Sequence, residues 1–220
     1  MIAKALISNE IPPLKLTDNG ERVLNWMDEF KVAELPLIDG KKYLGLVEEY
    51  HIIDANDVKQ QLGELHLKLD RPFVLEHQHL FDVIITLAKY DVDVVAVLNA
   101  NDEYLGVISS RDIIKHLAQT VSIENAGSIV TLEMNTKDYS MVEIAKIVES
   151  DNAKILSSFV SSNVDSTKLE VTLKINKSDI SRILHTFDRF NYKVTASYQE
   201  SEYIEDLKKR YDEFMRYLNI

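Results

Sequence analysis

Hydrophobic and polar positions recur in the same order twice along the first 120 residues of the chain. Two stretches carry apolar residues at helical spacing: Val23, Met27 and Phe30, and then Leu80, Val83, Ile84 and Leu87. Each stretch is followed by a short apolar run that suits a buried strand, at 35–38 and at 94–98, and then by a turn. The order of helix, strand, turn and strand therefore occurs twice.

The strand after each turn has nearly the same sequence in both copies. Residues 43–47 read YLGLV, and residues 104–108 read YLGVI. A further helical pattern follows the second copy, at Ile113, Ile114, Leu117 and Ala118. Two copies are too few for a solenoid. We therefore predict a tandem pair of βαββα repeats, with repeat 1 at residues 1–60 and repeat 2 at residues 61–121.

A different pattern begins near residue 128. Alternating and helical spacings follow one another there as strand 130–134, helix 141–148, strands 155–160 and 169–175, helix 180–187 and strand 192–198. This βαββαβ order is typical of the split ferredoxin-like unit, whose two helices cover one face of an antiparallel sheet. We predict this domain at residues 128–199, and the fold class of the whole chain is then α+β.

The last segment, 200–220, predicts a helix from about residue 202 to 218. Its apolar residues recur at alternating steps of three and four, as in a coiled-coil seam about two heptads long: Ile204, Leu207, Tyr211, Phe214 and Leu218. Such a helix could pack on its own domain or on a partner subunit. The sequence leaves both arrangements open.

The composition of the chain limits the kinds of partner and site that it can have. The chain has 220 residues, a formal net charge of −11 and no cysteine. The negative charge argues against a nucleic-acid partner, because Lys and Arg must neutralise the phosphates. The lack of cysteine excludes disulfides, thiolate nucleophiles and cysteine-ligated zinc. Since we find neither a secretory signal nor a run of about 18 apolar residues, we expect a cytoplasmic protein without a membrane partner.

Ser109 and Asp112 stand at the turn between the last strand of repeat 2 and the helix that follows it. The first N–H groups of a helix have no partner within the helix, and the helix dipole favours a phosphate there. A carboxylate three residues further on could bind the two hydroxyls of a ribose. The same two residues also fit a capping box, which needs no ligand. The residues alone leave both interpretations open.

The tandem pair resembles two cystathionine-β-synthase (CBS) domains, a module that often senses adenine nucleotides. The resemblance covers about residues 1–120. Its most specific part is 106–112, which matches the family pattern of glycine, two aliphatic residues, Ser or Thr, two variable residues and Asp. In that family the hydroxyl and the carboxylate contact phosphate and ribose, while adenine lies against apolar backbone of the other repeat.

Carried over by position, the resemblance implies a set of site residues. In repeat 2 these are Ile108, Ser109 and Asp112. Arg111, which stands between them, would add a phosphate contact if its side chain faces the cleft, and the alternative is an arginine in solvent. The adenine wall would be Ile11, Pro12, Pro13, Val32, Ala33 and Leu35. The ligand would be AMP, ADP, ATP or S-adenosylmethionine, bound as a regulatory ligand rather than as a required cofactor.

Repeat 1 departs from the family pattern at both polar positions. Glu48 stands where Ser or Thr is expected, and His51 stands where Asp is expected. A carboxylate repels an incoming phosphate by about 1 kcal/mol at contact in water. A histidine cannot hold a diol as a carboxylate does. We therefore predict one competent nucleotide cleft per chain and no metal site, since no further ligand stands at a suitable spacing from His51.

Following a CBS pair, the βαββαβ unit resembles an ACT domain, a small-molecule regulatory module of amino-acid enzymes. The whole arrangement is similar to acetoin-utilisation protein B and its relatives. In the ACT family a glycine in the first strand-to-helix loop lets an amino acid approach the backbone. Residues 135–140 contain no glycine. The resemblance therefore implies pairing between subunits in a homodimer rather than amino-acid binding.

Signatures of common enzyme classes are missing from the sequence. It has no Walker A loop, no G-x-G-x-x-G, no H-E-x-x-H and no G-x-S-x-G. We therefore expect a non-catalytic regulatory protein that binds an adenine nucleotide between the CBS repeats and transmits its state through a dimer. The regulated enzyme is not identified by the sequence. The alternative is a structural oligomerisation module with a degenerate, ligand-free cleft, in which Ser109 and Asp112 act only as a helix cap.

Overall fold

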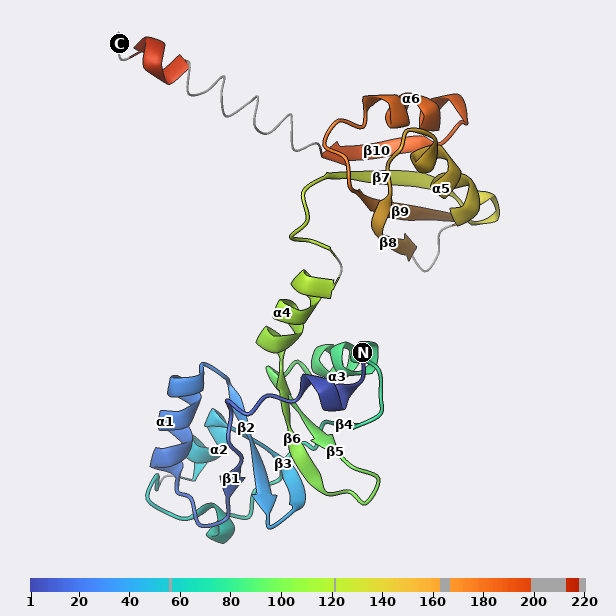
Figure 1. The fold of residues 1–220 in the computed structure, drawn as a ribbon. Coiled ribbons are helices and arrows are strands. Elements are labelled where there is room, and N and C mark those ends of the chain that lie inside the picture. Colours follow the sequence, from blue (N-terminus) through green and yellow to red (C-terminus); the bar gives the residue numbers. More distant parts are fainter. Residues whose placement is uncertain (56, 121, 163–166, 199–212, 218–220) are drawn as a thin grey trace. The chain divides into compact units, whose positions relative to one another are not determined.

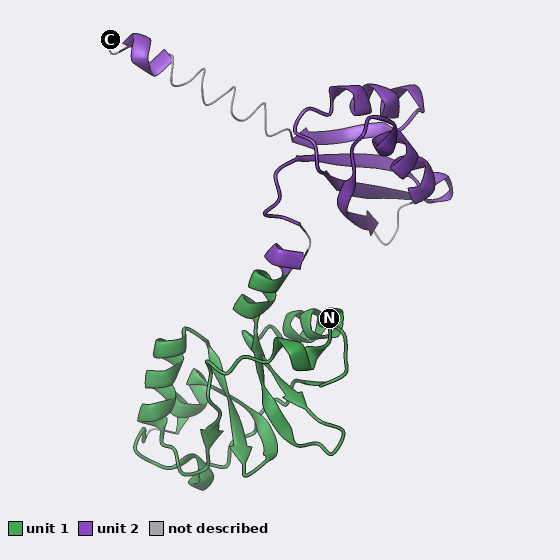
Figure 2. Cartoon of the chain, in the orientation of Figure 1, with its two compact units in different colours: residues 1–116 green, residues 117–220 purple. Residues whose placement is uncertain are grey.

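The computed structural model describes residues 1–55, 57–120, 122–162, 167–198 and 213–217. The chain forms two compact units, residues 1–116 and residues 117–220 (Figure 2). In the described part of the chain, no helix has both the length and the apolar run needed to cross a membrane. The secondary structure mixes helices and strands throughout, so the predicted α+β class is confirmed.

Unit 1 contains two halves whose strands and α-helices follow the same order, βαββα (Figure 1). The first half consists of η1 (Ala3–Leu6), β1 (Leu14–Lys15), α1 (Gly20–Phe30), β2 (Glu34–Asp39), β3 (Lys42–Glu48), α2 (Glu49–Asp54) and η2 (Leu62–Glu64). The second half consists of β4 (Phe73–Leu75), α3 (Leu80–Tyr90), β5 (Val94–Leu98), β6 (Tyr104–Ser109) and α4 (Ser110–Thr120). Helix α4 runs across the division between the two units.

Each half of unit 1 has its own three-stranded sheet, in the orders β1-β2-β3 and β4-β5-β6. In both sheets the first pair of strands is parallel and the second pair is antiparallel. The registers also agree, because Leu37 lies opposite Gly45 in one sheet and Val97 lies opposite Gly106 in the other. Both sheets shift register at the next residue. The tandem repeat predicted from the sequence is therefore present in the fold.

The ends of the two equivalent helices follow from local sequence. The side chain of Asn19 accepts a hydrogen bond from the N–H of Arg22 and so caps α1. His79 and Asp82 form a capping box at the start of α3. Both helices end at a left-handed residue, Lys31 with φ 56° and Asp91 with φ 54°. The chain therefore turns into the next strand at the same point in each repeat.

The core of unit 1 is shared by both repeats. It contains Leu14, Val23, Leu35, Tyr43, Leu46 and Val47 from the first half and Val94, Ala96, Leu98 and Val107 from the second. The segment before β1 reaches this core through Ile11, and the N–H of Ser8 donates to the carbonyl of Val107 at 2.9 Å. Burial of one continuous apolar cluster by both repeats holds them in a fixed relation to each other.

Unit 2 contains β7 (Ser128–Asn135), η3 (Thr136–Asp138), α5 (Met141–Ser150), β8 (Ile155–Ser162), β9 (Lys168–Ile175), α6 (Ser181–Arg189) and β10 (Lys193–Tyr198). The strands form one antiparallel sheet in the order β10-β7-β9-β8 (Figure 1). Alternate side chains of β7 and β9 pack with the inward faces of α5 and α6 in one core. The predicted βαββαβ order is confirmed, whereas membership of the ACT family stays a prediction.

Between the two repeats, residues 54–66 hold the end of α2 and the short turn η2. The carboxyl-terminal helix predicted at 202–218 lies largely outside the described residues. Residues 213–217 are helical.

Candidate functional site

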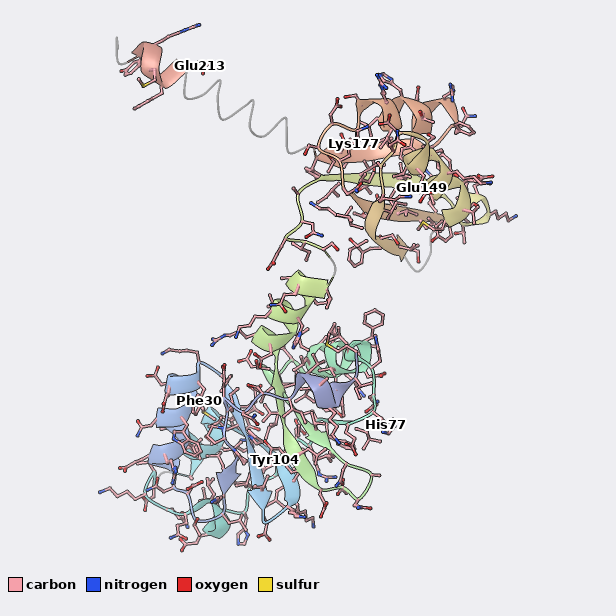
Figure 3. The ribbon with its side chains drawn as sticks, viewed as in Figure 1. Phe30, His77, Tyr104, Glu149, Lys177 and Glu213 are labelled. Carbon is pink, nitrogen blue, oxygen red and sulfur yellow. The ribbon has the colours of Figure 1, made fainter. Side chains whose placement is uncertain are left out.

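A cavity of about 190 Å³ opens in unit 1 where the carboxyl end of α1 meets the start of α4. Phe30, labelled in Figure 3, is the last residue of α1 and lines it. Both repeats contribute lining residues: Glu10, Ile11, Glu29, Phe30, Lys31 and Val32 from the first, and Asp93, Ser109, Ser110, Arg111 and Asp112 from the second. The site is thus built by the two repeats together.

Ser109 and Asp112 bind each other at the start of α4. The Ser109 hydroxyl donates to Asp112 Oδ2 at 2.6 Å, and the N–H of Asp112 donates to Ser109 Oγ at 3.1 Å. Asp112 Oδ1 lies 3.7 Å from Lys115 Nζ. Ser109 is only 6% exposed. The hydroxyl therefore caps the helix, and a ligand at this turn would have to share or replace these bonds.

The start of α4 offers fewer N–H groups than an open helix end. The N–H of Ser110 donates to the carbonyl of Asp93 at 2.8 Å, and that of Asp112 is held by Ser109. Two of the first three N–H groups are therefore bound to protein oxygens. A phosphate at this cavity would depend more on charged side chains than on the helix end.

The charges around the cavity are mixed. Two cations, Lys31 and Arg111, line it together with four carboxylates, Glu10, Glu29, Asp93 and Asp112. The formal sum is 2 − 4 = −2 for these lining residues. Because of this negative field, each added phosphate charge on a bound ligand would be repelled.

Several predicted site residues line the cavity and others do not. Ile11, Val32, Ser109, Arg111 and Asp112 are among the lining residues. Pro12, Pro13, Ala33, Leu35 and Ile108 are outside the lining. The side chains of Leu35 and Ile108 are fully buried, like those of their neighbours along β2 and β6.

Sequence reasoning missed Glu10, Glu29, Lys31, Asp93 and Ser110 as lining residues. Asp93 could have been found from the repeat, since it occupies in repeat 2 the position of Ala33 in repeat 1. Its side chain reaches across, and the N–H of Ala33 donates to Asp93 Oδ2 at 3.0 Å. One wall of the cavity is therefore a contact between equivalent positions of the two repeats.

A second carboxylate, that of Glu34, also forms hydrogen bonds from one repeat to the other. Glu34 Oε1 accepts hydrogen bonds from the N–H groups of Asp93 and, at 3.0 Å, of Val94. Glu34 is 3% exposed, and this burial raises the pKa of its carboxyl to about 7. Glu34 and Asp93 thus each bind the backbone of the opposite repeat. We call these two residues the carboxylate clasp.

The turn of repeat 1 that corresponds to the Ser109–Asp112 turn of repeat 2 is occupied by the protein's own groups. His51 Nδ1 accepts the N–H of Glu48 at 3.0 Å, and Nε2 lies 3.3 Å from the carbonyl of Lys68. His51 is 7% exposed. The N–H of Leu46 donates to the carbonyl of Asp70 at 2.9 Å, which lays segment 68–70 along β3. Both ring nitrogens of His51 are therefore engaged within the fold.

Comparison with known proteins gives a distant curated relative. A stretch of 145 residues is 25% identical to an uncharacterized 33.4 kDa protein in the ribosomal RNA operon of Thermofilum pendens. The match covers 56% of this chain and 48% of that protein. The chain thus spans about half the length of the curated relative.

Solved structures with a similar fold match about half of the chain. One is a CBS domain pair/ACT domain protein from Thermotoga maritima, with 17% identity, a TM-score of 0.48 and coverage of 54% of this chain and 98% of that one. Another is CBSX2 in complex with AMP, with 18% identity, a TM-score of 0.45 and coverage of 54% and 96%. A third is the CBS domain of a bacterial CNNM/CorC family Mg²⁺ transporter in complex with ATP, with 14% identity, a TM-score of 0.44 and coverage of 54% and 87%.

The family model described as the CBS domain matches residues 65–119 of this chain. The match contains the whole of α3, β5, β6 and nearly all of α4, and with them Ser109 and Asp112. It covers the second repeat of unit 1, whose topology the first repeat shares. Residues 65–119 are therefore similar to a CBS domain.

Proposed function

We propose that this chain is a non-catalytic, cytoplasmic regulatory protein that binds an adenine nucleotide in the cavity between its two repeats. The observation that carries the proposal is the composition of that cavity. Ser109 and Asp112 enter it from the CBS domain, and Ile11 and Val32 enter it from the opposite repeat. A hydroxyl and a carboxylate thus line the same hollow as two apolar side chains, which suits a ligand with a polar sugar phosphate and an apolar base.

In this proposal the ribose hydroxyls bind Asp112, and the phosphate lies near Ser109 with Lys31 and Arg111 as its counter-charges. The base packs against Ile11 and Val32. The cavity of about 190 Å³ is smaller than the roughly 300–1,000 Å³ usual for ligand pockets. Its rim, however, is formed by long exposed side chains, which can move aside on binding. The negative field favours a monophosphate such as AMP over ATP, and the small size of the cavity favours AMP over both ATP and the larger S-adenosylmethionine.

The proposal includes a homodimer that transmits the ligand state to a regulated enzyme. Binding can bias the arrangement of two subunits only if the two arrangements differ in affinity for the nucleotide. Within one chain, such a difference in nucleotide affinity would arise through the carboxylate clasp. Asp93 lines the cavity and also holds the backbone of the opposite repeat.

A second candidate function is the structural module with a ligand-free cleft. The mutual bonds of Ser109 and Asp112 favour it, because a cap that is already complete needs no ligand. The two functions differ in one property that can be measured. Only the first predicts that a nucleotide stabilises the protein.

Thermal unfolding with AMP, ADP, ATP and S-adenosylmethionine separates the two candidates. At about 100 times its Kd, a ligand stabilises the native state by about 2.7 kcal/mol. We expect the midpoint of wild type to rise by several degrees with AMP and the midpoint of Asp112→Ala to stay unchanged. Asp82→Ala is the matched control, since Asp82 is the third residue of α3 and accepts the N–H of His79 away from the cavity.

The control should lose stability without ligand and keep the full nucleotide shift. An equal shift in wild type and Asp112→Ala would place the nucleotide elsewhere on the chain. No shift with any of the four ligands would favour the structural module.

A further inference from the structure

Glu34 is a buried carboxyl group next to the cavity between the repeats, although it is not one of the lining residues. It is the first residue of β2 and is 3% exposed. Its Oε1 accepts the N–H of Asp93, and Asp93 lines the cavity. A charge on Glu34 is therefore separated from the cavity by a single residue.

The hydrogen bonds of Glu34 do not require the carboxyl group to be ionised. Oε1 accepts the N–H of Asp93 and, at 3.0 Å, that of Val94. A neutral carboxyl group accepts both bonds through its carbonyl oxygen, as a carboxylate does. Within the described part of the chain, no basic side chain acts on Glu34. Both protonation states therefore fit the same bonds, and burial and neighbouring charges decide between them.

The ionisable groups that face Glu34 are acidic or neutral. Asp93 faces it from the residue before β5, and Glu48 lies opposite it on β3. The buried phenol of Tyr43, also on β3, lies within the field of Glu34. Burial raises the pKa of Glu34 to about 7, helped by the charges of Asp93 and Glu48 and opposed by the two backbone hydrogen bonds. Glu34 therefore changes its charge near neutral pH.

The cations of the cavity do not offset a charge on Glu34. Lys31 and Arg111 line the cavity, but neither is among the groups that shift the pKa of Glu34. Lys31 is also paired with Asp28 at 2.7 Å. A nucleotide monophosphate carries a charge of roughly −1.5 to −2 at pH 7, and solvent screens such charges little in a buried region. Ionised Glu34 therefore repels a phosphate in the cavity, and a bound phosphate favours the proton on Glu34.

We propose that nucleotide binding to this chain is linked to protonation of Glu34, so that a neutral Glu34 favours the bound state and an ionised Glu34 opposes it. The inference rests on the proposed function, since it concerns the same cavity. A chain with an ionised Glu34 takes up a proton from solvent when it binds the nucleotide. Because linkage is reciprocal, acidification raises the nucleotide affinity, and the nucleotide raises the affinity of Glu34 for its proton. The cavity thus responds to pH as well as to nucleotide.

Calorimetric titration of the full chain with AMP between about pH 6 and pH 8.5 tests this linkage in wild type and in Glu34→Gln. Glutamine accepts the same N–H groups but stays neutral. The phosphate of AMP also titrates, with a pKa of about 6, but it does so equally for both proteins. The ratio of the two Kd values therefore isolates Glu34. We expect the ratio to be near one at pH 6 and wild type to bind roughly five to ten times more weakly at pH 8.5.

Glu103→Gln is the matched control, because it removes one negative charge from unit 1 and leaves a titratable Glu34 in place. Glu103 immediately precedes β6 and does not line the cavity. Hydrogen bonds from Asn99 and Lys41 lower its pKa, so it stays ionised at every pH of the titration. This variant should show the pH dependence of wild type. Circular dichroism establishes that both variants are folded at each pH.

Proton uptake is a second measurement on the same proteins. Binding enthalpies in buffers of different ionisation enthalpy give the number of protons taken up with each AMP. Near pH 7.5 we expect about half a proton for wild type and none for Glu34→Gln.

The outcomes separate this inference from the proposed function. A Kd ratio that does not change with pH, or equal proton uptake in wild type and Glu34→Gln, would overturn the linkage and leave nucleotide binding intact. Loss of the pH dependence in Glu103→Gln would assign the effect to the overall charge and also overturn the linkage. Absence of AMP binding at every pH would overturn the proposed function and the linkage together.

Discussion

Glu34→Gln is expected to make the protein more stable than wild type above pH 7 by about 2–3 kcal/mol and to leave the stability near pH 5 almost unchanged. Burial raises the pKa of Glu34 to about 7 in the folded state, against an ordinary value of 4.5. Between these two pH values the unfolded chain has lost the proton and the folded chain still holds it. Stability is therefore lost as pH rises from about 4.5 to 7, by about 3 kcal/mol in all.

Glutamine keeps the oxygen that accepts the N–H groups of Asp93 and Val94 but cannot ionise. The measurement is the free energy of unfolding in urea at several pH values. Glu133→Gln gives the contrast, because bonds from Lys168 and Lys193 lower the pKa of Glu133 to about 2. The Glu133 carboxylate stabilises the folded state above its ordinary pKa, and this stabilisation is lost as pH falls towards 2. A pH profile of Glu34→Gln parallel to that of wild type between pH 5 and 9 would refute the role given to Glu34.

Gly45→Ala is expected to lower the free energy of unfolding by about 3 kcal/mol. A Cβ at this position would lie 2.5 Å from Leu69 Cβ and 2.7 Å from the carbonyl oxygen of Asp70, and the backbone has a φ of +153°. Crowding of a packed site and a strained φ each cost roughly 1–3 kcal/mol. The glycine lets segment 68–70 lie against β3, where it engages His51 and Leu46.

Gly40→Ala is the matched control for this substitution. Gly40 has a φ of +58°, but a Cβ there would meet no atom within 4 Å. The left-handed backbone conformation alone then lowers the free energy of unfolding, by about 1–2 kcal/mol. Urea unfolding of both variants measures the difference. Equal losses at the two positions would show that close packing against Leu69 and Asp70 does not decide the stability of this region.

The sequence predicted the fold well because the signals that set it are local. Alternation at Val130, Leu132 and Met134 determines which face of β7 is buried, and no distant residue is needed to recognise it. The matching sequences at 43–47 and 104–108 fall on β3 and β6, which have the same place and register in their sheets. A repeated sequence thus led directly to a repeated topology.

The site was predicted less completely, since much of it depends on contacts between distant residues. Ser109 and Asp112 are three residues apart at a helix start, so their contact follows from local geometry. The bonds of Glu34 to Asp93 and Val94 join residues 59 and 60 positions apart. No periodicity distinguishes these carboxylates from the other acidic residues of the chain. Leu35 and Ile108 were assigned to the site by position, and this assignment stays a prediction; their side chains are buried in the core.

The most direct test of the account is a calorimetric titration of the full chain with AMP, performed on wild type, Asp112→Asn and Asp82→Asn. The account predicts one AMP bound per chain in wild type and in Asp82→Asn, and no detectable binding in Asp112→Asn. Two molecules bound per chain, or unchanged affinity in Asp112→Asn, would contradict it.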